Sequence, residues 1–543
     1  MLRRSSPVRL TSHLQISAAG SRPMTDSSST PNAGAKAKKT KNDGRDPEVI
    51  RAKLEERARK RAEREAVGAQ PPSLHLKPEQ GKLNFIKREW IDLRKEQRWQ
   101  ERFGERKLNG RTLRLMTWNM LAQGLIRRTL FPGSDCLKWK DRGATLTRQI
   151  LVYDPEIACL QEVDRVDHHG PILAQAGYDM SYHIGYSKKV HGLMIAWKRD
   201  RYRLCTAFHG ARLEEAKAEE APEPGRQALQ AGELLVKLDD AGPGLSHVTR
   251  NIGLAVGLER IDEPAQGCII VTHHLFWHAR YSYERARQMG LLIQRVMEWR
   301  ASSPVAKDWP VVVAGDYNSQ PYDVLYSLMT GSPLSETHRA ILHDSSVVHK
   351  SVDGASARRV TAETDNDEDD LQEEGAAGAD SSKRENGLED GPSYVDADGD
   401  EDRVLKGCRE ARSADALLTQ AQLEDLYRDQ RWQSAYGHAY HLVASEDGNR
   451  FGDRDERWQP QSKPSEEDDA VKLGCHEPMW TNFTPLWRCT LDYIFVALPK
   501  DSELIVTGLL PTHRTAIAEP GLPHSEKEPS DHFSLMCELV LPA

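Results

Sequence analysis

Seven short apolar runs recur between residues 113 and 541, and they constrain the fold of this chain more than any other feature. They cover residues 113–120, 157–163, 192–198, 268–275, 310–318, 491–498 and 533–541. Short apolar runs bounded by polar residues are typical of strands buried in a core. Residues 281–302 instead place Met289, Ile293, Val296 and Met297 at helical spacing. This spacing predicts a helix with one core face.

The 543-residue chain is too long for one minimal domain. We expect residues 1–81 to be a disordered basic region with a solvated helix near 46–67, and residues 82–543 to form the folded body. Residues 209–245 are rich in Ala, Glu and Gly, and residues 340–470 contain an acidic tract. Long structureless segments inside a compact domain are usually disordered excursions. We therefore expect a disordered acidic insertion near 345–410.

Charge is unevenly distributed along the chain. The formal net charge is −8, but residues 361–404 contain 17 acidic and 3 basic residues, which leaves +6 for the rest. A mildly basic body beside an acidic tract suits a partner that carries phosphates. A solvated linker beside an ordinary surface is the alternative interpretation.

The eight cysteines are scattered and form no CxxC pair, which is typical of buried free thiols in a reducing compartment. No apolar run approaches the roughly 18 residues of a membrane span, so no membrane association is expected. The first 25 residues contain four arginines and no acid. They are compatible with a mitochondrial transit peptide or a disordered tail. The run Lys36–Lys41 suits a nuclear address or a phosphate-binding patch. We expect a cytoplasmic or nuclear protein, with mitochondria as the alternative.

Polar groups lie at or near the ends of six of these regions: Asn119, Glu162, His274, Asp316 with Asn318, Asp492, and Asp531 with His532. One such residue alone is typical of a capped turn, but six points in one domain favour a common site. Hard oxygen ligands without arranged thiolates favour Mg²⁺, with Mn²⁺ as a substitute, over zinc. Carboxylates can activate water, and imidazoles and amides can contact phosphate oxygens. The set therefore suits metal-assisted hydrolysis of a phosphate ester.

The ordered motifs TWNM, LQEV, THHL, GDYNSQP, LDYIF and SDH resemble the endonuclease/exonuclease/phosphatase superfamily over about residues 113–541. The resemblance implies a four-layered α/β sandwich, in which two packed mixed β-sheets are flanked by helices and the site lies at one rim. The stretches TWNMLAQGL, EPMWTNFTPLWRCTLDYIF and HHLFWHARYSYERARQ are most similar to the RNA-degrading branch. That branch contains carbon catabolite repression deadenylases, nocturnin, Angel proteins and fungal NGL-type exonucleases.

Two departures argue against other branches of the superfamily. Abasic-site repair endonucleases usually place Tyr where this chain has His274. Inositol polyphosphate phosphatases have a Cys-Asp-Arg motif where this chain reads TLDYIF. His273 and His274 are adjacent, and we assign the motif position to His274 because it directly precedes the Leu.

The resemblance implies a metal group and a catalytic group. Glu162 matches the principal Mg²⁺ ligand, Asn119 lies beside the metal and water network, and Asp531 matches a metal-side acid. The catalytic group is Asp316, which activates water, Asn318, which orients the phosphate, His274, which contacts the scissile phosphate, and Asp492, the partner of His532. In an extended backbone, Asp316 and Asn318 would point to the same face.

Five further residues are candidates for substrate binding. His278, Arg280 and Lys189 are expected to contact phosphates or bases, or else to be surface residues. Trp480 and Phe483 could stack a base, because aromatic side chains are sequence-tolerant platforms for single strands. Packing in the core or at the rim is their alternative role.

The resemblance predicts a Mg²⁺-dependent 3′→5′ exoribonuclease that releases 5′-mononucleotides in RNA processing or deadenylation. Its partner would be RNA with a free 3′ end, and the N-terminal tail or the acidic insertion could recruit proteins. A nocturnin-like phosphatase of a small nucleotide such as NADPH is one alternative. A non-catalytic RNA-binding scaffold is another, although it would need a gap among the carboxylates, and none is visible.

Overall fold

The computed structural model describes residues 84–104, 106, 108, 110–186, 189–208, 229–264, 266–353, 407–454, 473–500 and 502–542. The expected helix near 46–67, the arginine-rich start, the Lys36–Lys41 run and the acidic tract at 361–404 lie outside these residues. The structure therefore leaves those expectations untested.

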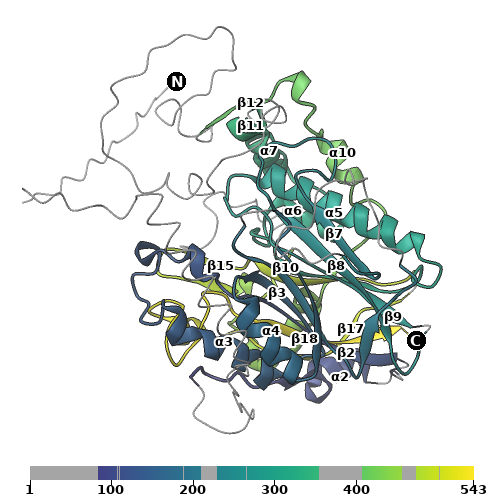
Figure 1. Ribbon diagram of the computed structural model, residues 1–543, viewed down its shortest axis with the longest axis vertical. Helices are drawn as coiled ribbons and strands as arrows, with labels where there is room; N and C mark the ends of the chain where they lie inside the picture. The colour runs from purple at the N-terminus through teal and green to yellow at the C-terminus, as the bar shows by residue number, and fades with distance from the viewer. Residues whose placement is uncertain are drawn as a thin grey trace, which may run out of the picture. The chain divides into compact units, whose positions relative to one another are not determined.

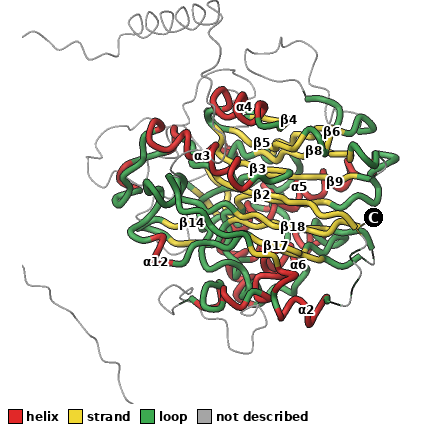
Figure 2. The backbone as a smooth tube through the Cα atoms, turned by 90° about the horizontal axis from the view of Figure 1, so that it is seen from below, coloured by secondary structure: helices red, strands yellow, loops and turns green. Residues whose placement is uncertain are grey.

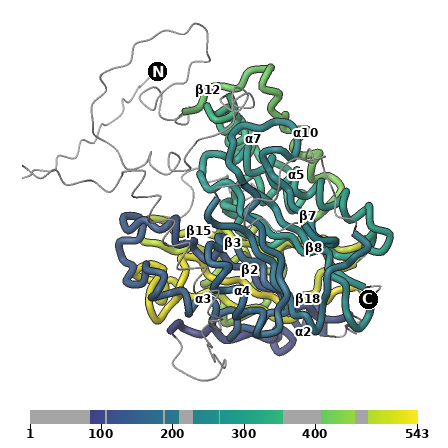
Figure 3. The backbone as a smooth tube through the Cα atoms, viewed as in Figure 1, coloured from purple at the N-terminus to yellow at the C-terminus, as the bar shows by residue number. Residues whose placement is uncertain are grey.

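Two seven-stranded sheets form the body (Figure 1). In the first sheet the order is β1 (Ile91–Asp92), β17 (Ile505–Leu509), β18 (Leu535–Pro542), β2 (Gly110–Asn119), β3 (Ile157–Val163), β5 (Gly192–Lys198) and β4 (Tyr178–His183). Figure 2 shows this succession from β4 to β17, and Figure 3 shows the C-terminal β18 beside β2. Strands β2 and β3 are parallel, whereas the neighbouring pairs are antiparallel. The first sheet is therefore mixed, as expected.

The second sheet has the order β13 (Gln433–Ser434), β16 (Asp492–Ala497), β10 (Val311–Asp316), β9 (Gly267–His273), β8 (Ile252–Arg260) and β6 (Tyr202–Leu204). Strand β7 (Glu233–Lys237) also pairs with β8. Strands β9 and β10 are parallel, whereas β8–β9 and β10–β16 are antiparallel. Two small hairpins complete the sheet structure: β11 (Val347–His349) with β12 (Cys408–Glu410), and β14 (Asn482–Phe483) with β15 (Arg488–Cys489).

Helices cover the outer faces of the two sheets (Figure 1). Beside the first sheet lie α3 (Trp139–Tyr153) and α4 (Val166–Gln175), and beside the second lie α5 (Ser282–Ser302), α6 (Val324–Thr330) and α7 (Glu336–Ser345). The shorter helices are α2 (Gln97–Phe103), α10 (Gln420–Asp425), α11 (Ala435–Ala439) and α12 (Thr515–Ala518). The 3₁₀ turns are Leu93–Lys95, Gln123–Leu125, Arg128–Leu130, Ser413–Asp415, Tyr440–Leu442, Ala444–Glu446 and Phe451–Asp453.

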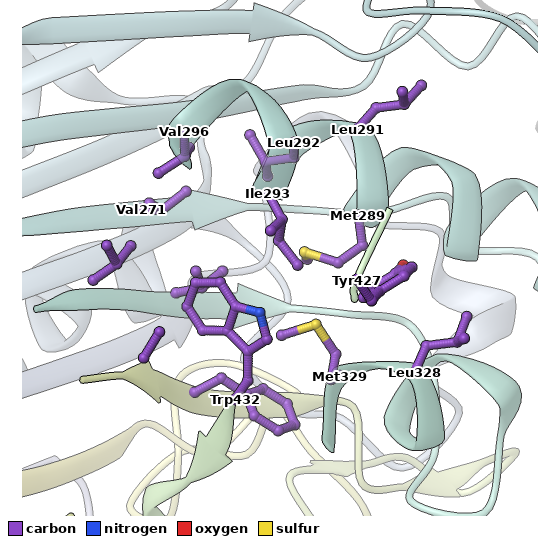
Figure 4. Packing of buried hydrophobic residues seen from close by; sticks show 14 of the residues in the cluster. Val271, Met289, Leu291, Leu292, Ile293, Val296, Leu328, Met329, Tyr427 and Trp432 are labelled. Carbon is purple, nitrogen blue, oxygen red and sulfur yellow. The ribbon is translucent and has the colours of Figure 1, made fainter. Parts of the chain in front are cut away.

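Successive side chains of each strand point to opposite faces of its sheet, and this divides the core into three apolar layers. Leu115 faces the second sheet, whereas its neighbour Met116 faces α3. Likewise Ile270 packs between the sheets, whereas Val271 packs against α5 (Figure 4). Successive side chains of a strand point to opposite faces, so strands covered on both sides are apolar throughout. The four-layered α/β sandwich predicted from the resemblance is confirmed.

All seven apolar runs contain a strand, and α5 coincides with the predicted helix. Its residues Met289, Ile293 and Val296 are buried, and Met297 is partly buried against the same layer. The sequence reading did not identify β8, which contains Gly253 and Gly257. A Cβ at these glycines would meet Leu292 at 2.3 Å and Phe208 at 2.2 Å. Glycine weakens a strand signal, but here it allows close packing.

The insertions predicted at residues 209–245 and near 345–410 include residues that the structure places in the folded body. The hairpin β11–β12 closes the acidic insertion at its base, so only residues 354–406 of the predicted 345–410 lie outside the described residues. Residues 407–454 are part of the body: β13 joins the second sheet, and Trp432, Tyr436 and Tyr440 are buried. Strand β7 falls within 209–245. A segment that is polar on average can still belong to the core through a few buried aromatic residues, and its overall composition does not reveal this.

The eight cysteines are free thiols, as predicted, and six of them are buried. Among the described helices, none has the length and apolar content of a membrane span.

Candidate active site

The polar strand ends converge at one edge of the two sheets. Asp316 and Asp492 are direct partners across β10 and β16. His274 forms a parallel bridge with Asp316. In the first sheet, Asn119 ends β2 opposite Gln161, directly before Glu162. Because β2 and β3 are parallel, as are β9 and β10, their carboxyl ends meet at a common edge.

Glu162 is turned into this edge by an irregular backbone. Its φ is +55°, a left-handed value that is uncommon for a non-glycine residue. The β3–β5 register shifts between Leu160 and Val163, so β3 carries one extra residue there. Strained backbone of this kind often marks functional sites. Ala122 N donates a 2.7 Å hydrogen bond to Glu162 Oε2.

Asn119 connects acids from the two sheets. Its Nδ2 donates to Glu162 Oε1 and to Asp316 Oδ2, both at 3.0 Å. Its Oδ1 accepts from Leu121 N at 3.0 Å, and its backbone carbonyl accepts from Ser530 Oγ at 2.7 Å. The amide is therefore fixed on every side and sets the distance between two carboxylates.

His274 lies between the same two acids. Its Nδ1 is 3.9 Å from Glu162 Oε1, and its Nε2 is 3.6 Å from Asp316 Oδ2. The adjacent His273 instead lies in the core, where its ring meets Tyr317 edge-on at 4.2 Å. The structure thus brings His274, and not His273, to the cluster.

Asp492 and His532 form a buried pair. His532 Nδ1 donates to Asp492 Oδ2 at 2.8 Å, and His532 Nε2 lies 3.7 Å from Asp316 Oδ2. Burial alone would lower the pKa of His532, but Asp492, Asp531 and Asp316 raise it well above its usual value. The imidazole is therefore held as a cation among carboxylates.

Asp531 completes the edge from the loop before β18. Its Oδ2 accepts from Asn482 Nδ2 at 3.1 Å. Burial raises the pKa of Asp531, and the nearby Glu162 raises it further against the opposing effect of His532. For Glu162, burial likewise acts to raise the pKa, but His274, His191 and the Asn119 and Ala122 donors keep it below its ordinary value.

These acids form an environment that fits a divalent cation. The four carboxylates of Glu162, Asp316, Asp492 and Asp531 are all buried. Ligand atoms of Asp316, Asp492 and His532 lie within 4.8 Å of one another, and Asp492 Oδ1 accepts no hydrogen bond within the described residues. Buried acids that repel one another are stabilised by a bound cation.

Asn318 differs from the expectation. The strand ends at Asp316, and the φ of Asn318 is +47°, so the two side chains do not share the face of an extended strand. Asn318 N donates to Asp316 Oδ1 at 2.9 Å, and its Nδ2 donates to Leu275 O at 2.9 Å. The residue turns the chain and holds the segment after His274. Gly315 is required nearby, because a Cβ there would lie 2.5 Å from His273 O.

The stacking role expected for Trp480 and Phe483 does not agree with the structure. Their exposed fractions are 2% and 0%, and both pack in a small core with Phe533. Arg454 lies 4.0 Å from the Trp480 ring centroid, and Arg488 lies 4.5 Å from that of Phe483. Neither ring has a face open to a base. Of their two possible roles, core packing is the one observed.

The three residues expected to contact phosphates or bases differ in exposure and in partners. Lys189 Nζ donates to Arg250 O at 2.8 Å, and burial lowers its pKa to about 8 against the attraction of Asp239 and Glu162. His278 is half-buried and Arg280 is exposed. Both follow His274 in the segment that leads to α5.

Sequence reasoning missed two neighbours of the acids. His191 lies 6.5 Å from His274 between ring centroids, and Asn482 holds Asp531. His191 directly precedes β5 in HGLMIAWK, so the strand-end signal that identified the other residues would have identified it too. Asn482 gave no such signal, because its two-residue strand has no apolar run.

Comparisons with known proteins find a family model and several relatives that match this chain. Residues 116–359 match the model of the Endonuclease/Exonuclease/phosphatase family. A Schizosaccharomyces pombe protein named probable RNA exonuclease C9B6.11c is 28% identical over 91% of this chain and 88% of its own length. RNA exonuclease NGL2 of Saccharomyces cerevisiae is 25% identical over 94% of this chain and 91% of its own.

A crystal structure of ANGEL2, described as a 2′,3′-cyclic phosphatase, aligns with 84% of this chain and 99% of its own, at 18% identity and a TM-score of 0.49. The residues matched by the family model include Asn119, Glu162, His274 and Asp316. Over these residues the chain resembles the hydrolases of the endonuclease/exonuclease/phosphatase family, and over nearly its whole length it is similar to proteins named RNA exonucleases.

Proposed function

We propose that this protein is a Mg²⁺-dependent 3′→5′ exoribonuclease that releases 5′-mononucleotides. The observation that carries the proposal is the Asn119 amide, which joins Glu162 of one sheet to Asp316 of the other beside His274. Two relatives that match over almost the whole chain are named probable RNA exonuclease and RNA exonuclease, which supports RNA as the substrate.

Glu162 and Asp531 would hold the cation, with Asn119 keeping Glu162 in place. The alternative group of Asp316, Asp492 and His532 is less suitable, because it includes an imidazole whose Nδ1 is already hydrogen-bonded to Asp492 Oδ2 at 2.8 Å. Oxygen ligands also suit Mg²⁺ better than an imidazole does. When bound, the cation would supply positive charge against phosphate oxygens.

The remaining residues would act on water and phosphate. Asp316 would accept a proton from the attacking water, because its Oδ2 faces the site beside His274 and His532. The oxygen of that water bonds to phosphorus while the bond to the 3′ oxygen of the preceding nucleotide breaks. That oxygen takes up a proton and becomes the new 3′ end.

The two histidines would stabilise the charge that builds on the phosphate. His274, held between Glu162 and Asp316, would contact the scissile phosphate. His532 would be kept cationic and oriented by Asp492. Charged donors fixed before the reaction are effective at this task, because they need no reorganisation. Asn318 would act through the Leu275 carbonyl that it holds, and thereby position the segment after His274.

The test is degradation of 5′-labelled poly(A), poly(U) and structured RNA by the purified protein, with Mg²⁺ and with EDTA. We expect a ladder that shortens one nucleotide at a time from the 3′ end and free 5′-mononucleotides, with Mg²⁺ only. NADPH is included as a competing substrate. Release of phosphate from NADPH with intact RNA, or RNA binding without cleavage of either substrate, would overturn the proposal.

A further inference from the structure

The segment Leu275–Tyr281, between β9 and α5, begins directly after His274 and is held in place by side chains. Leu275 O accepts from Asn318 Nδ2 at 2.9 Å, and Phe276 N donates to Gln288 Oε1 at 3.2 Å. Arg285 donates to His278 O and, at 2.6 Å, to Ala279 O. A surface segment with this many backbone bonds has a defined conformation.

A small apolar cluster packs against the same segment. Phe276 and Tyr281 are buried together with Val347 of β11 and Cys408 of β12. Tyr281 Oη lies 3.1 Å from Cys408 Sγ, within hydrogen-bond distance for a sulfur contact. The hairpin β11–β12 therefore packs against Phe276 and Tyr281, which lie on either side of Trp277 in the chain.

Trp277 differs from every other described Trp and Phe residue. It is 44% exposed, whereas the others are buried or half-buried. Its ring lies 6.2 Å from Phe276 and 5.2 Å from His278, so its neighbours orient the indole without covering it. Single exposed apolar residues are common. Trp277, however, is aromatic, lies in the hydrogen-bonded segment Leu275–Tyr281 and follows His274, the proposed phosphate contact, by three residues.

We propose that Trp277 is a stacking platform for a base at the 3′ end of single-stranded RNA; this rests on the proposed exoribonuclease function. Three residues of chain place the Cα atoms of Trp277 and His274 within about 11 Å of each other. A base next to the phosphate at His274 is then within reach of the indole. An aromatic face accepts any base, so the platform favours unpaired ends without selecting a sequence. It replaces the role expected for Trp480 and Phe483, whose rings are buried.

The experiment compares oligoribonucleotides whose last two nucleotides either carry bases or are abasic. Binding is measured by fluorescence anisotropy in EDTA, so that it does not depend on cleavage, and kcat/KM is measured separately with Mg²⁺. The variants are Trp277→Ala and Trp277→Phe. The control is Ile261→Ala, which removes an exposed apolar side chain (42%) near the opposite end of β9.

The wild-type protein is expected to bind the base-bearing strand more tightly than the abasic strand. Trp277→Ala should weaken binding of the base-bearing strand by roughly 5- to 100-fold, as expected for the loss of one base–aromatic stack. It should leave the abasic strand almost unchanged. Trp277→Phe should retain much of the preference, and Ile261→Ala should retain all of it.

The outcomes distinguish the two proposals. Unchanged discrimination in Trp277→Ala, with RNA degradation intact in the wild type, would overturn the stacking role alone. Two other results would show that Trp277 only supports the fold, and either would also overturn the stacking role. One is an equal loss of affinity for the base-bearing and abasic strands in Trp277→Ala. The other is an equal loss of affinity in Trp277→Ala and Trp277→Phe together with a lowered melting temperature. A wild-type protein that cleaves no RNA would instead overturn the proposed function.

Discussion

The charged residues at the two ends of strands β2 and β3 differ in pairing and in exposure to solvent. At the starting end, Arg201 pairs with Glu156 at 3.1 Å, and Arg114 pairs with Glu538 at 3.1 Å. These basic side chains are 60% and 37% exposed. At the finishing end, Glu162 is buried beside other carboxylates and imidazoles. Charge that is paired and hydrated stabilises a surface weakly, whereas buried unbalanced acids favour a bound cation.

Glu156 and Glu162 provide the sharpest test of this difference, because Glu156 directly precedes β3 and Glu162 lies near its end. We expect Glu162→Ala to lower the Mg²⁺-dependent kcat by at least ~10³-fold, since charge stabilisation by a metal contributes several kcal/mol. Glu156→Ala should keep nearly full activity. Circular dichroism should show both variants folded. Robust cleavage by Glu162→Ala would contradict the proposed metal ligand.

Asp492→Asn is expected to have the next largest effect. The amide keeps the shape of the side chain but removes the charge that raises the pKa of His532 and orients its ring. We expect kcat to fall about 10²–10⁴-fold, in the range of other acid–base partners. Asp154→Asn, at the opposite end, is the matched control. Equal activity of the two variants would remove the distinction between the ends.

Cation binding can be measured without activity. Mg²⁺ at about 100 times its dissociation constant should stabilise the wild type by about 2.7 kcal/mol through preferential binding to the folded state. EDTA should reverse the resulting rise in melting temperature. The rise should persist in Glu156→Ala and disappear in Glu162→Ala. A Mg²⁺ shift that survives in Glu162→Ala but is lost in Asp492→Asn would place the ion in the Asp316–Asp492–His532 group instead.

The smallest effect is expected at the partly exposed ion pair of Arg201 and Glu156. Arg201→Ala breaks its pair with Glu156, in which the Arg201 side chain is 60% and the Glu156 side chain 19% exposed, and ion pairs at a surface contribute only about 0–1 kcal/mol. Urea denaturation should therefore show a change in the free energy of unfolding below about 1 kcal/mol, and RNA cleavage should be unaffected. A loss of several kcal/mol would mean that this end is more than a hydrated charged surface.

Most residues of the candidate site could be identified from the sequence, because strand periodicity and strand ends are local features. Asn119, Glu162, His274, Asp316, Asp492 and Asp531 each stand beside an apolar run, so one reading identified them together. The burial of Trp480 and Phe483 could not be predicted in this way. Their neighbour Phe533 is about fifty residues away in the chain, and aromatic side chains suit a core and a stacking platform equally well.

The acidic insertion shows the same limit. Composition located the charge, but it did not reveal that β11 and β12 pair across the interruption, or that Trp432 and Tyr436 belong to the core. Pairing between distant short strands has no local signature, because the hydrogen-bond partner of each strand lies elsewhere in the chain.

By itself, the sequence determined that strands buried on both faces end in carboxylates, amides and imidazoles, because apolar runs and their polar ends are local features of the sequence. Only the tertiary structure decided that Glu162 enters the site through a left-handed bulge, that Asn119 spans the two sheets, and that Asn318 turns away to hold Leu275. Those outcomes depend on register and backbone dihedrals. Both are set by packing between strands that are far apart in the chain.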